Sequence, residues 1–316
     1  MAKRVSKITL GIDVAKDESV VYDWDTAEIL TLPNQEKRIK EWLQSLHGDV
    51  QIAIEPTSHY HLSWVEEALA LDYELYLINP RQLAQYREAV NVRNKTDPQD
   101  AWLLARYLVH EHSQLRPYQP QCRQAQQLWA LLKRRAVAVA ARKQMQQSYS
   151  EIRKTAQALI THFQQLLARI DLRIRKLIQA LGLTNEYRCC LSIPVIGPLN
   201  AAALVASCHR GAFAKSETFI AFIGMDVRLR ESGRYKGKRK LTKRGEAELR
   251  RLLYCAAQPA RCYQPFEDFY QRQLDKGLPK IAAKVILARK LARIAFSLMN
   301  KQQMFIKRAD PIADSP

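Results

Sequence analysis

Alternating apolar and polar residues mark the first third of the chain. Aliphatic side chains recur at every second position from Ile8 to Val14, which predicts a strand over residues 8–14 with Asp13 on the opposite face. Similar patterns predict further strands over residues 19–24, 28–32, 51–56 and 74–78, and helices over residues 35–46, 61–71 and 81–90. Three strands in a meander, followed by strand–helix units, predict a mixed α/β sheet flanked by helices.

A polar motif, Asn94-Lys95-Thr96-Asp97-Pro98-Gln99-Asp100, precedes an apolar helical run from Ala101 to Leu108. We expect Asp97 to cap this helix, Pro98 to take its first position, and Asp97 and Asp100 to project from one face. Two carboxylates this close repel each other, and a divalent cation with oxygen ligands would relieve the repulsion. The alternative is a capping residue and a first-turn acid that complements the helix dipole, without a metal. The motif alone leaves both interpretations open.

The composition changes after the segment Leu115-Arg116-Pro117-Tyr118-Gln119-Pro120, whose two prolines mark a boundary. Residues 123–181 contain neither glycine nor proline and carry far more Lys and Arg than Asp and Glu, which predicts a long basic helical pair. It is either a solvated spacer or a coiled coil that dimerises and lies along nucleic acid. A basic amphipathic helix is also expected within residues 279–307, where its apolar stripe packs in a core, and disorder over residues 309–316.

Two segments of the C-terminal half could meet phosphate. The turn from Ile193 to Pro198 resembles a helix-hairpin-helix turn, in which Gly197 opens a helix whose backbone N–H groups face a phosphate. A plain tight turn between core helices is the alternative. Farther on, cations crowd one loop that must either bind phosphate or stay disordered: Arg228, Arg230, Arg234, Lys236, Lys238, Arg239, Lys240, Lys243 and Arg244.

Composition favours a polyanionic partner. The 316 residues include 50 Lys and Arg against 31 Asp and Glu, which gives a formal net charge of +19. Nucleic acid is the default partner of so basic a chain. Neither a membrane-spanning run nor a signal-peptide core is present in the sequence, so a cytoplasmic protein is expected. The six cysteines form no Cys-x-x-Cys pair and are expected to be reduced thiols.

Four motifs together resemble the RuvC-like DEDD domain of insertion-sequence family 110 transposases, which include pilin-gene invertases. They are Gly11-Ile12-Asp13-Val14-Ala15-Lys16, Ile54-Glu55-Pro56-Thr57-Ser58-His59-Tyr60, Ile78-Asn79-Pro80 and Asn94-Lys95-Thr96-Asp97-Pro98-Gln99-Asp100-Ala101. The resemblance implies a ribonuclease-H-like N-terminal fold and a catalytic metal site for Mg²⁺ (or Mn²⁺) formed by Asp13, Glu55, Asp97 and Asp100. Carboxylates that hold Mg²⁺ suit phosphodiester transfer, because the metal neutralises charge on the reacting phosphate. Lys95 is expected to bind nucleic acid beside them.

A second block, Glu231-Ser232-Gly233, resembles the element that carries the nucleophilic serine of the same family. The resemblance makes Ser232 that nucleophile, although family members often carry proline where this chain has Val227. Without the family, Ser232 and Gly233 would be an ordinary turn.

The resemblance covers nearly the whole chain and implies its organisation. We expect a RuvC-like catalytic domain over residues 1–117, a basic helical coiled-coil spacer over 118–183, a mostly α-helical, serine-bearing transposase domain over 184–308, and a disordered tail over 309–316. The implied function is DNA cutting and rejoining on donor and target DNA, guided by a structured non-coding RNA, in the bacterial cytoplasm at the nucleoid. The implied assembly is a dimer or tetramer in which the carboxylates of one protomer meet the serine loop of another.

Two other functions compete with this one. A RuvC-like junction endonuclease would hydrolyse DNA with metal-activated water and would not use a serine. A non-enzymatic nucleic-acid scaffold with a decayed site is the other alternative. The presence of all four acids and of Ser232 argues against a decayed site, and the Glu231-Ser232-Gly233 element argues against plain hydrolysis.

Overall fold

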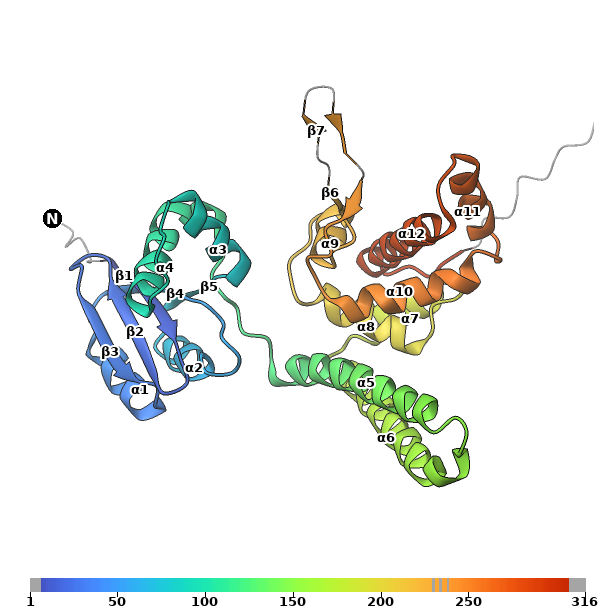
Figure 1. Ribbon diagram of the computed structural model, residues 1–316, viewed down its shortest axis with the longest axis horizontal. Coiled ribbons are helices and arrows are strands. Elements are labelled where there is room, and N and C mark those ends of the chain that lie inside the picture. The colour runs from blue at the N-terminus through green and yellow to red at the C-terminus, as the bar shows by residue number, and fades with distance from the viewer. Residues whose placement is uncertain (1–6, 229–230, 233–234, 238, 307–316) are drawn as a thin grey trace, which may run out of the picture. The chain divides into compact units, whose positions relative to one another are not determined.

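The computed structural model describes residues 7–228, 231–232, 235–237 and 239–306 (Figure 1). The chain divides into two compact units, Met1–Pro120 and Gln121–Pro316, and each is described by itself. Arg230, Arg234 and Lys238 of the cation-rich loop lie outside the described residues, as does the tail over 309–316. The side chain of Lys236 is outside them as well.

The N-terminal unit contains one five-stranded sheet. Its strands are β1 (Lys7–Val14), β2 (Glu18–Asp23), β3 (Ile29–Pro33), β4 (Asp49–Ile54) and β5 (Glu74–Leu77), in the order β3-β2-β1-β4-β5. β1, β2 and β3 pair antiparallel, whereas β4 runs parallel to both β1 and β5. The expected meander and mixed sheet are therefore confirmed. β1 is the central strand and has parallel β4 at one side.

Helices cover both faces of this sheet. They are α1 (Glu36–Ser45), α2 (Leu62–Ala70), α3 (Pro80–Ala89) and α4 (Asp97–Glu111), followed by a short 3-10 turn over His112–Gln114. The aliphatic side chains of β1, such as Leu10 and Ile12, pack in one cluster with Ile39 of α1 and Trp64 of α2. Leu83 of α3 and the leucines of α4 form a separate cluster, and α3 and α4 lie on the other side of the sheet (Figure 1).

The C-terminal unit opens with two long helices that pack against each other, α5 (Arg123–Ser148) and α6 (Arg153–Ala180). The expected helical pair is therefore confirmed. The guanidinium of Arg135 in α5 donates to both carboxylate oxygens of Asp171 in α6, at 2.5 and 3.0 Å. Such a bidentate pair fixes the register of the two helices more than it stabilises them.

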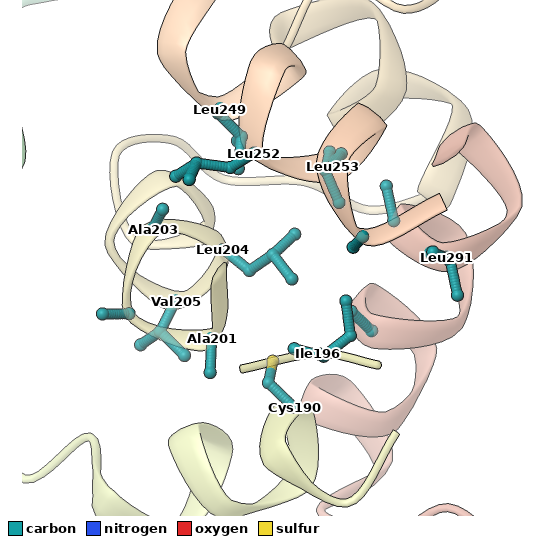
Figure 2. Packing of buried hydrophobic residues seen from close by; sticks show 14 of the residues in the cluster. Cys190, Ile196, Ala201, Ala203, Leu204, Val205, Leu249, Leu252, Leu253 and Leu291 are labelled. Atoms are coloured by element: carbon teal, nitrogen blue, oxygen red, sulfur yellow. The ribbon is translucent and has the colours of Figure 1, made fainter. Parts of the chain in front are cut away.

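Shorter helices complete the described part of this unit: α7 (Thr184–Leu191), α8 (Pro198–Cys208), α9 (Ser216–Phe222), α10 (Ala247–Ala260), α11 (Phe266–Asp275) and α12 (Lys280–Lys301). α8 is apolar on nearly every face and lies inside the cluster that the others surround. Figure 2 shows Leu204 of α8 pointing toward the centre of this cluster, which Leu253 of α10 and Leu291 of α12 line from other sides. The expected C-terminal amphipathic helix is α12.

A β-hairpin interrupts this helical unit between α9 and α10. β6 (Val227–Arg228) pairs with β9 (Lys240–Leu241), and beyond them β7 (Glu231–Ser232) pairs with β8 (Tyr235–Lys236). Both ladders are antiparallel, and the hairpin extends away from α9 (Figure 1). The cation-rich loop thus contains two short ladders, although it has no regular apolar pattern. Within the described part of the unit, these are all the strands it contains.

Candidate functional site

Asp13 and Glu55 come from neighbouring parallel strands. Asp13 lies one residue before the end of β1, and Glu55 directly follows the last residue of β4. The register pairs Gly11 with Ala53 and Ile12 with Ile54, so the two acids leave adjacent strands at nearly the same level. Both are half-buried. The sequence pattern had placed Asp13 on the face opposite the aliphatic residues of its strand.

The start of α4 brings the other two acids. Its N-cap is Thr96, whose side chain makes no capping hydrogen bond, and Asp97 is the first helical residue. The expectation that Asp97 caps the helix and Pro98 takes its first position is therefore wrong by one residue, because the helix begins at Asp97 and Pro98 is its second residue. Asp97 is exposed, whereas Asp100 is only 5% exposed. A buried carboxylate without a partner would be costly, so Asp100 needs a cation.

Gly11 sets how closely α4 approaches β1. A Cβ atom at this position would lie 2.0 Å from the carbonyl oxygen of Ala101 and 2.4 Å from the backbone nitrogen of Ala105. Only glycine permits this backbone-to-backbone contact. Gly11 precedes Asp13 by two residues on the same face of β1, and Ala101 directly follows Asp100. The close approach therefore brings the acidic start of α4 to the acidic end of β1.

The charges of these acids act on one another. The pKa of Asp13 is raised from 3.8 to about 6, first by burial and then by the negative charges of Asp100, Asp97 and Glu55, with Lys95 opposing. The pKa of Glu55 is also raised, chiefly by burial, while Lys95 and Arg87 lower it and Asp100 raises it. The acids that the sequence singled out thus share one electrostatic environment, and removing their mutual repulsion requires positive charge.

Two cations of the chain partly supply that charge. Arg87 of α3 donates from Nη2 to Oδ1 of Asp100 at 2.5 Å, and from Nη1 to the backbone oxygen of Asn94 at 3.3 Å. Lys95 is exposed, and its charge acts on both Asp13 and Glu55. Sequence reasoning missed Arg87, which occurs in an ordinary polar helix. Only the packing of α3 against α4 reveals its role.

The donor set suits a hard divalent cation, although the side chains do not yet form a cage. Among the described residues, no three His, Cys, Asp or Glu side chains lie close enough together to hold a metal ion as they stand. Carboxylate oxygens are nevertheless the ligands that Mg²⁺ prefers, and the negative charges that add to the effect of burial on the pKa of Asp13 are ones that such an ion would offset. Side-chain rotations and release of an Asp100 oxygen by Arg87 would be needed to hold it.

Ser232 lies in the hairpin of the C-terminal unit. It is exposed, and its backbone pairs with Tyr235 across the β7–β8 ladder. Of the cations expected to bind nucleic acid here, Arg228, Arg239, Lys240, Lys243 and Arg244 have described side chains, and all five are exposed. An exposed hydroxyl flanked by cations can approach a phosphodiester without displacing packed side chains.

Two glycines anchor the base of this hairpin. A Cβ atom on Gly245 would lie 2.4 Å from the carbonyl oxygen of Phe222, and one on Gly224 would lie 2.8 Å from the backbone nitrogen of Arg244. Gly224 also has a φ of +71°, which favours glycine. The two ends of the hairpin are thus packed backbone against backbone at α9.

Gly197 forms the N-cap of α8, as the sequence predicted for a glycine that opens a helix. Its φ of −82° is open to any residue, and no atom lies within 4 Å of the position that a Cβ would take. The unusual backbone is that of Val195, with a φ of 73°. Neither a close contact with the described residues nor the backbone conformation requires a glycine at position 197. Phosphate binding by this turn stays a prediction.

None of the described helices is both long and apolar enough to span a bilayer.

Family comparisons match the two halves of the chain separately. Residues 10–170 match the model of a DEDD transposase domain, described as "Transposase", and residues 187–271 match the "Transposase IS116/IS110/IS902 family".

Two curated relatives align with almost the entire chain. The pilin gene-inverting protein of Moraxella bovis is 26% identical over 96% of this chain and 99% of its own length. The pilin gene-inverting protein of Moraxella lacunata is 27% identical over the same shares. The first family match alone spans half of the chain and includes all four acids, and the second includes Ser232. The resemblance seen in the sequence motifs is confirmed: this chain belongs to the IS110 family of transposases and is a DNA recombinase.

Proposed function

We propose that this recombinase cuts and rejoins DNA through a divalent-metal site formed by Asp13, Glu55, Asp97 and Asp100, and through Ser232 as the nucleophile. The observation that carries the proposal is the gathering of acids from β1, β4 and α4 around a half-buried Asp13, whose pKa is raised to about 6 first by burial and then by the charges of Asp100, Asp97 and Glu55. Perturbed carboxylates gathered on separate elements are typical of functional sites. Their order along the sheet also favours a ribonuclease-H-like, RuvC-like domain.

The acidic residues would position the reacting phosphate. Mg²⁺ (or Mn²⁺), when bound, would supply positive charge that stabilises the phosphorane-like transition state. Asp13 and Glu55 are held by paired strands, and Asp100 by its helix and by Arg87, so their backbones need not move to bind it. Asp97 is exposed and is the acid that most readily adjusts to the substrate.

Ser232 would carry the strand between cutting and rejoining. Its Oγ attacks phosphorus, a new Oγ–P bond forms, the P–O bond to the departing DNA oxygen breaks, and the serine proton passes through a base to that oxygen, which leaves as a hydroxyl. Attack by an incoming DNA hydroxyl reverses these steps and releases Ser232. The phosphodiester energy is kept in the serine ester, so rejoining needs no ATP. The serine hydroxyl needs activation, for which the cations flanking β7 and a metal at the acids are suited.

The assembly would bring the acids and the serine together. We propose a homo-oligomer, dimeric or tetrameric, in which the acidic site of one protomer works with Ser232 of another. We also propose that a structured non-coding RNA guides it to donor and target DNA. The net charge of +19 and the basic helices α5 and α6 support large polyanionic partners. Work at the bacterial nucleoid in the cytoplasm follows from such substrates.

A nicked suicide substrate tests the serine mechanism. We expect a covalent DNA adduct on denaturing gels that maps to Ser232 by peptide mass spectrometry, and its loss in Ser232→Ala and in EDTA. Ser150→Ala is the matched control, because Ser150 is an exposed serine between α5 and α6, and it should form the adduct normally. Recombination by Ser232→Ala at the parental rate would overturn the serine mechanism and favour hydrolysis by metal-activated water. Strand transfer in EDTA would overturn the metal site.

A further inference from the structure

A groove of about 770 Å³ lies in the C-terminal unit, between the β6–β9 ladder and helices α11 and α12. Its floor is apolar, with Phe269 of α11 and Val285 and Ile286 of α12 among the side chains that form it. Its other feature is a set of five cations: Arg239, Lys240, Arg289, Lys290 and Arg293. Neither Asp nor Glu is among the described residues that line it.

The α12 cations in this groove are only partly neutralised. Burial lowers the pKa of Arg289, with Arg293 adding to the effect, and Asp226 and Glu217 oppose it. Burial likewise lowers the pKa of Lys290, and Arg272 adds to it. Nη2 of Arg293 lies 3.4 Å from Oε1 of Glu217. The Nε of the same arginine is nevertheless buried without a hydrogen-bond partner in the described part of the chain. Half-buried cations with so little negative charge nearby favour an anionic ligand.

The apolar floor restricts what that ligand can be. Phosphate alone would leave the floor uncovered, whereas a nucleotide offers an anion for the guanidinium groups and a planar base for apolar contact. Lys290 Nζ lies 3.9 Å from the ring centroid of Phe269, so this aromatic face already carries positive charge. The volume is within the roughly 300–1,000 Å³ range of small-ligand pockets. A second copy of the chain fits poorly, because its formal net charge is also +19.

We propose that this groove binds an unpaired DNA strand, with its phosphates at Arg289 and Arg293 and at least one base against the apolar floor. A duplex would hide the faces of its bases in the stack, so an unpaired segment is required. The groove shares β6 and β9 with the hairpin that carries Ser232. A strand held there is therefore held by the same unit as the serine. The choice of DNA rests on the proposed function.

Fluorescence anisotropy with the full-length protein tests the groove. The probes are an unpaired DNA of about 12 nucleotides, within the known range of strand-binding sites, its duplex, the RNA of the same sequence, and a DNA with abasic positions. The groove variant is Arg289→Gln with Arg293→Gln, the two residues assigned to the phosphates. Lys280→Gln with Lys301→Gln is the matched control, because it removes the same charge from exposed positions of the same helix.

We expect the groove variant to lose at least about tenfold in affinity for unpaired DNA, since charge-assisted hydrogen bonds are lost, and the control to lose much less. The loss should be smaller for the duplex, and the parent should bind the abasic probe more weakly than the intact strand because the base contact is missing. Equal losses for both variants, or equal losses on duplex and unpaired DNA, would overturn the proposal. A loss confined to RNA would assign the groove to RNA instead and overturn the DNA assignment. The Ser232 adduct is scored separately, so its failure would refute the serine mechanism without altering these affinities.

Discussion

Arg87 and Asp100 form a largely buried ion pair at the acidic site, with Nη2 2.5 Å from Oδ1 and side-chain exposures of 16% and 7%. The pair joins α3 to the first turn of α4. Removing one partner of a buried pair leaves the other charge uncompensated. Arg87 therefore acts as the resident counter-charge of the acid that a divalent cation is expected to share.

Replacing Arg87 should strengthen metal binding. Arg87→Met keeps a long apolar stem and removes one positive charge, so we expect Mn²⁺ affinity, measured by calorimetry, to rise roughly tenfold because the competing cation is gone. The metal-free variant should also melt at a lower temperature, since Asp100 loses its partner. A purely structural role would lower both stability and metal affinity.

The control for this change is Arg81→Met, because Arg81 is exposed on the same helix α3 and should leave metal affinity unchanged. Unchanged or weaker Mn²⁺ binding by Arg87→Met, when the parent binds the ion, would refute the competition between Arg87 and the metal. If neither protein binds Mn²⁺, the proposed metal site fails as well.

Gly11→Ala should separate α4 from β1. The added methyl group would lie 2.0 Å from the carbonyl oxygen of Ala101, so the helix must move. We expect a loss of about 2–4 kcal/mol in the free energy of unfolding, at the upper end of overpacking effects, and lost cleavage. Gly197→Ala is the control, because no atom lies within 4 Å of its added methyl group, and it should cost under about 1 kcal/mol. Similar urea midpoints for the two variants would contradict this account of Gly11.

Most of the N-terminal sheet could be predicted because β1 alternates between apolar and polar residues and the other strands are short runs rich in aliphatic residues. Asp13 and Glu55 stand out for the same reason, since each interrupts or ends an aliphatic strand. Arg87 could not be found in this way. Its partner Asp100 is 13 residues away on another helix, and nothing in the local pattern of α3 distinguishes one arginine from the next. Helix packing, not periodicity, creates the pair.

The hairpin and its groove were equally hidden from the sequence. The strands of the hairpin are two residues long, too short for any period to be seen, and their pairing depends on backbone packing at Gly224 and Gly245. The groove combines residues from Val227 to Arg293, which are far apart in the chain. Cation density predicted a phosphate-binding region, but not the apolar floor beside it.

The raised pKa of Asp13 makes a prediction about pH. An acid whose pKa is about 6 in the folded protein and 3.8 when unfolded binds its proton more tightly when folded, so its contribution to stability falls as pH rises from about 4 through 6. Asp13→Asn lacks this charge. In EDTA, the variant should therefore gain stability relative to the parent between pH 4 and 7, with little further change above pH 7. A difference in unfolding free energy that stays constant over this range would refute the shifted pKa.

The cations beside the hairpin should determine the salt dependence of duplex binding. Lys243 and Arg244 are exposed at the end of the hairpin that leads to α10. If each neutralises one phosphate, changing both to Gln should make the slope of log affinity against log salt less steep by about 1.8, because each contact contributes about 0.9 on duplex DNA. Lys37→Gln with Arg38→Gln is the control, because it removes the same two residue types from exposed positions on α1. These positions are distant along the chain from every residue expected to bind phosphate, so the control should leave the slope unchanged. Equal slopes for the hairpin variant and the parent would show that these two cations do not touch the DNA backbone. A parent slope near zero would go further and exclude phosphate neutralisation as the use of the chain's net charge of +19.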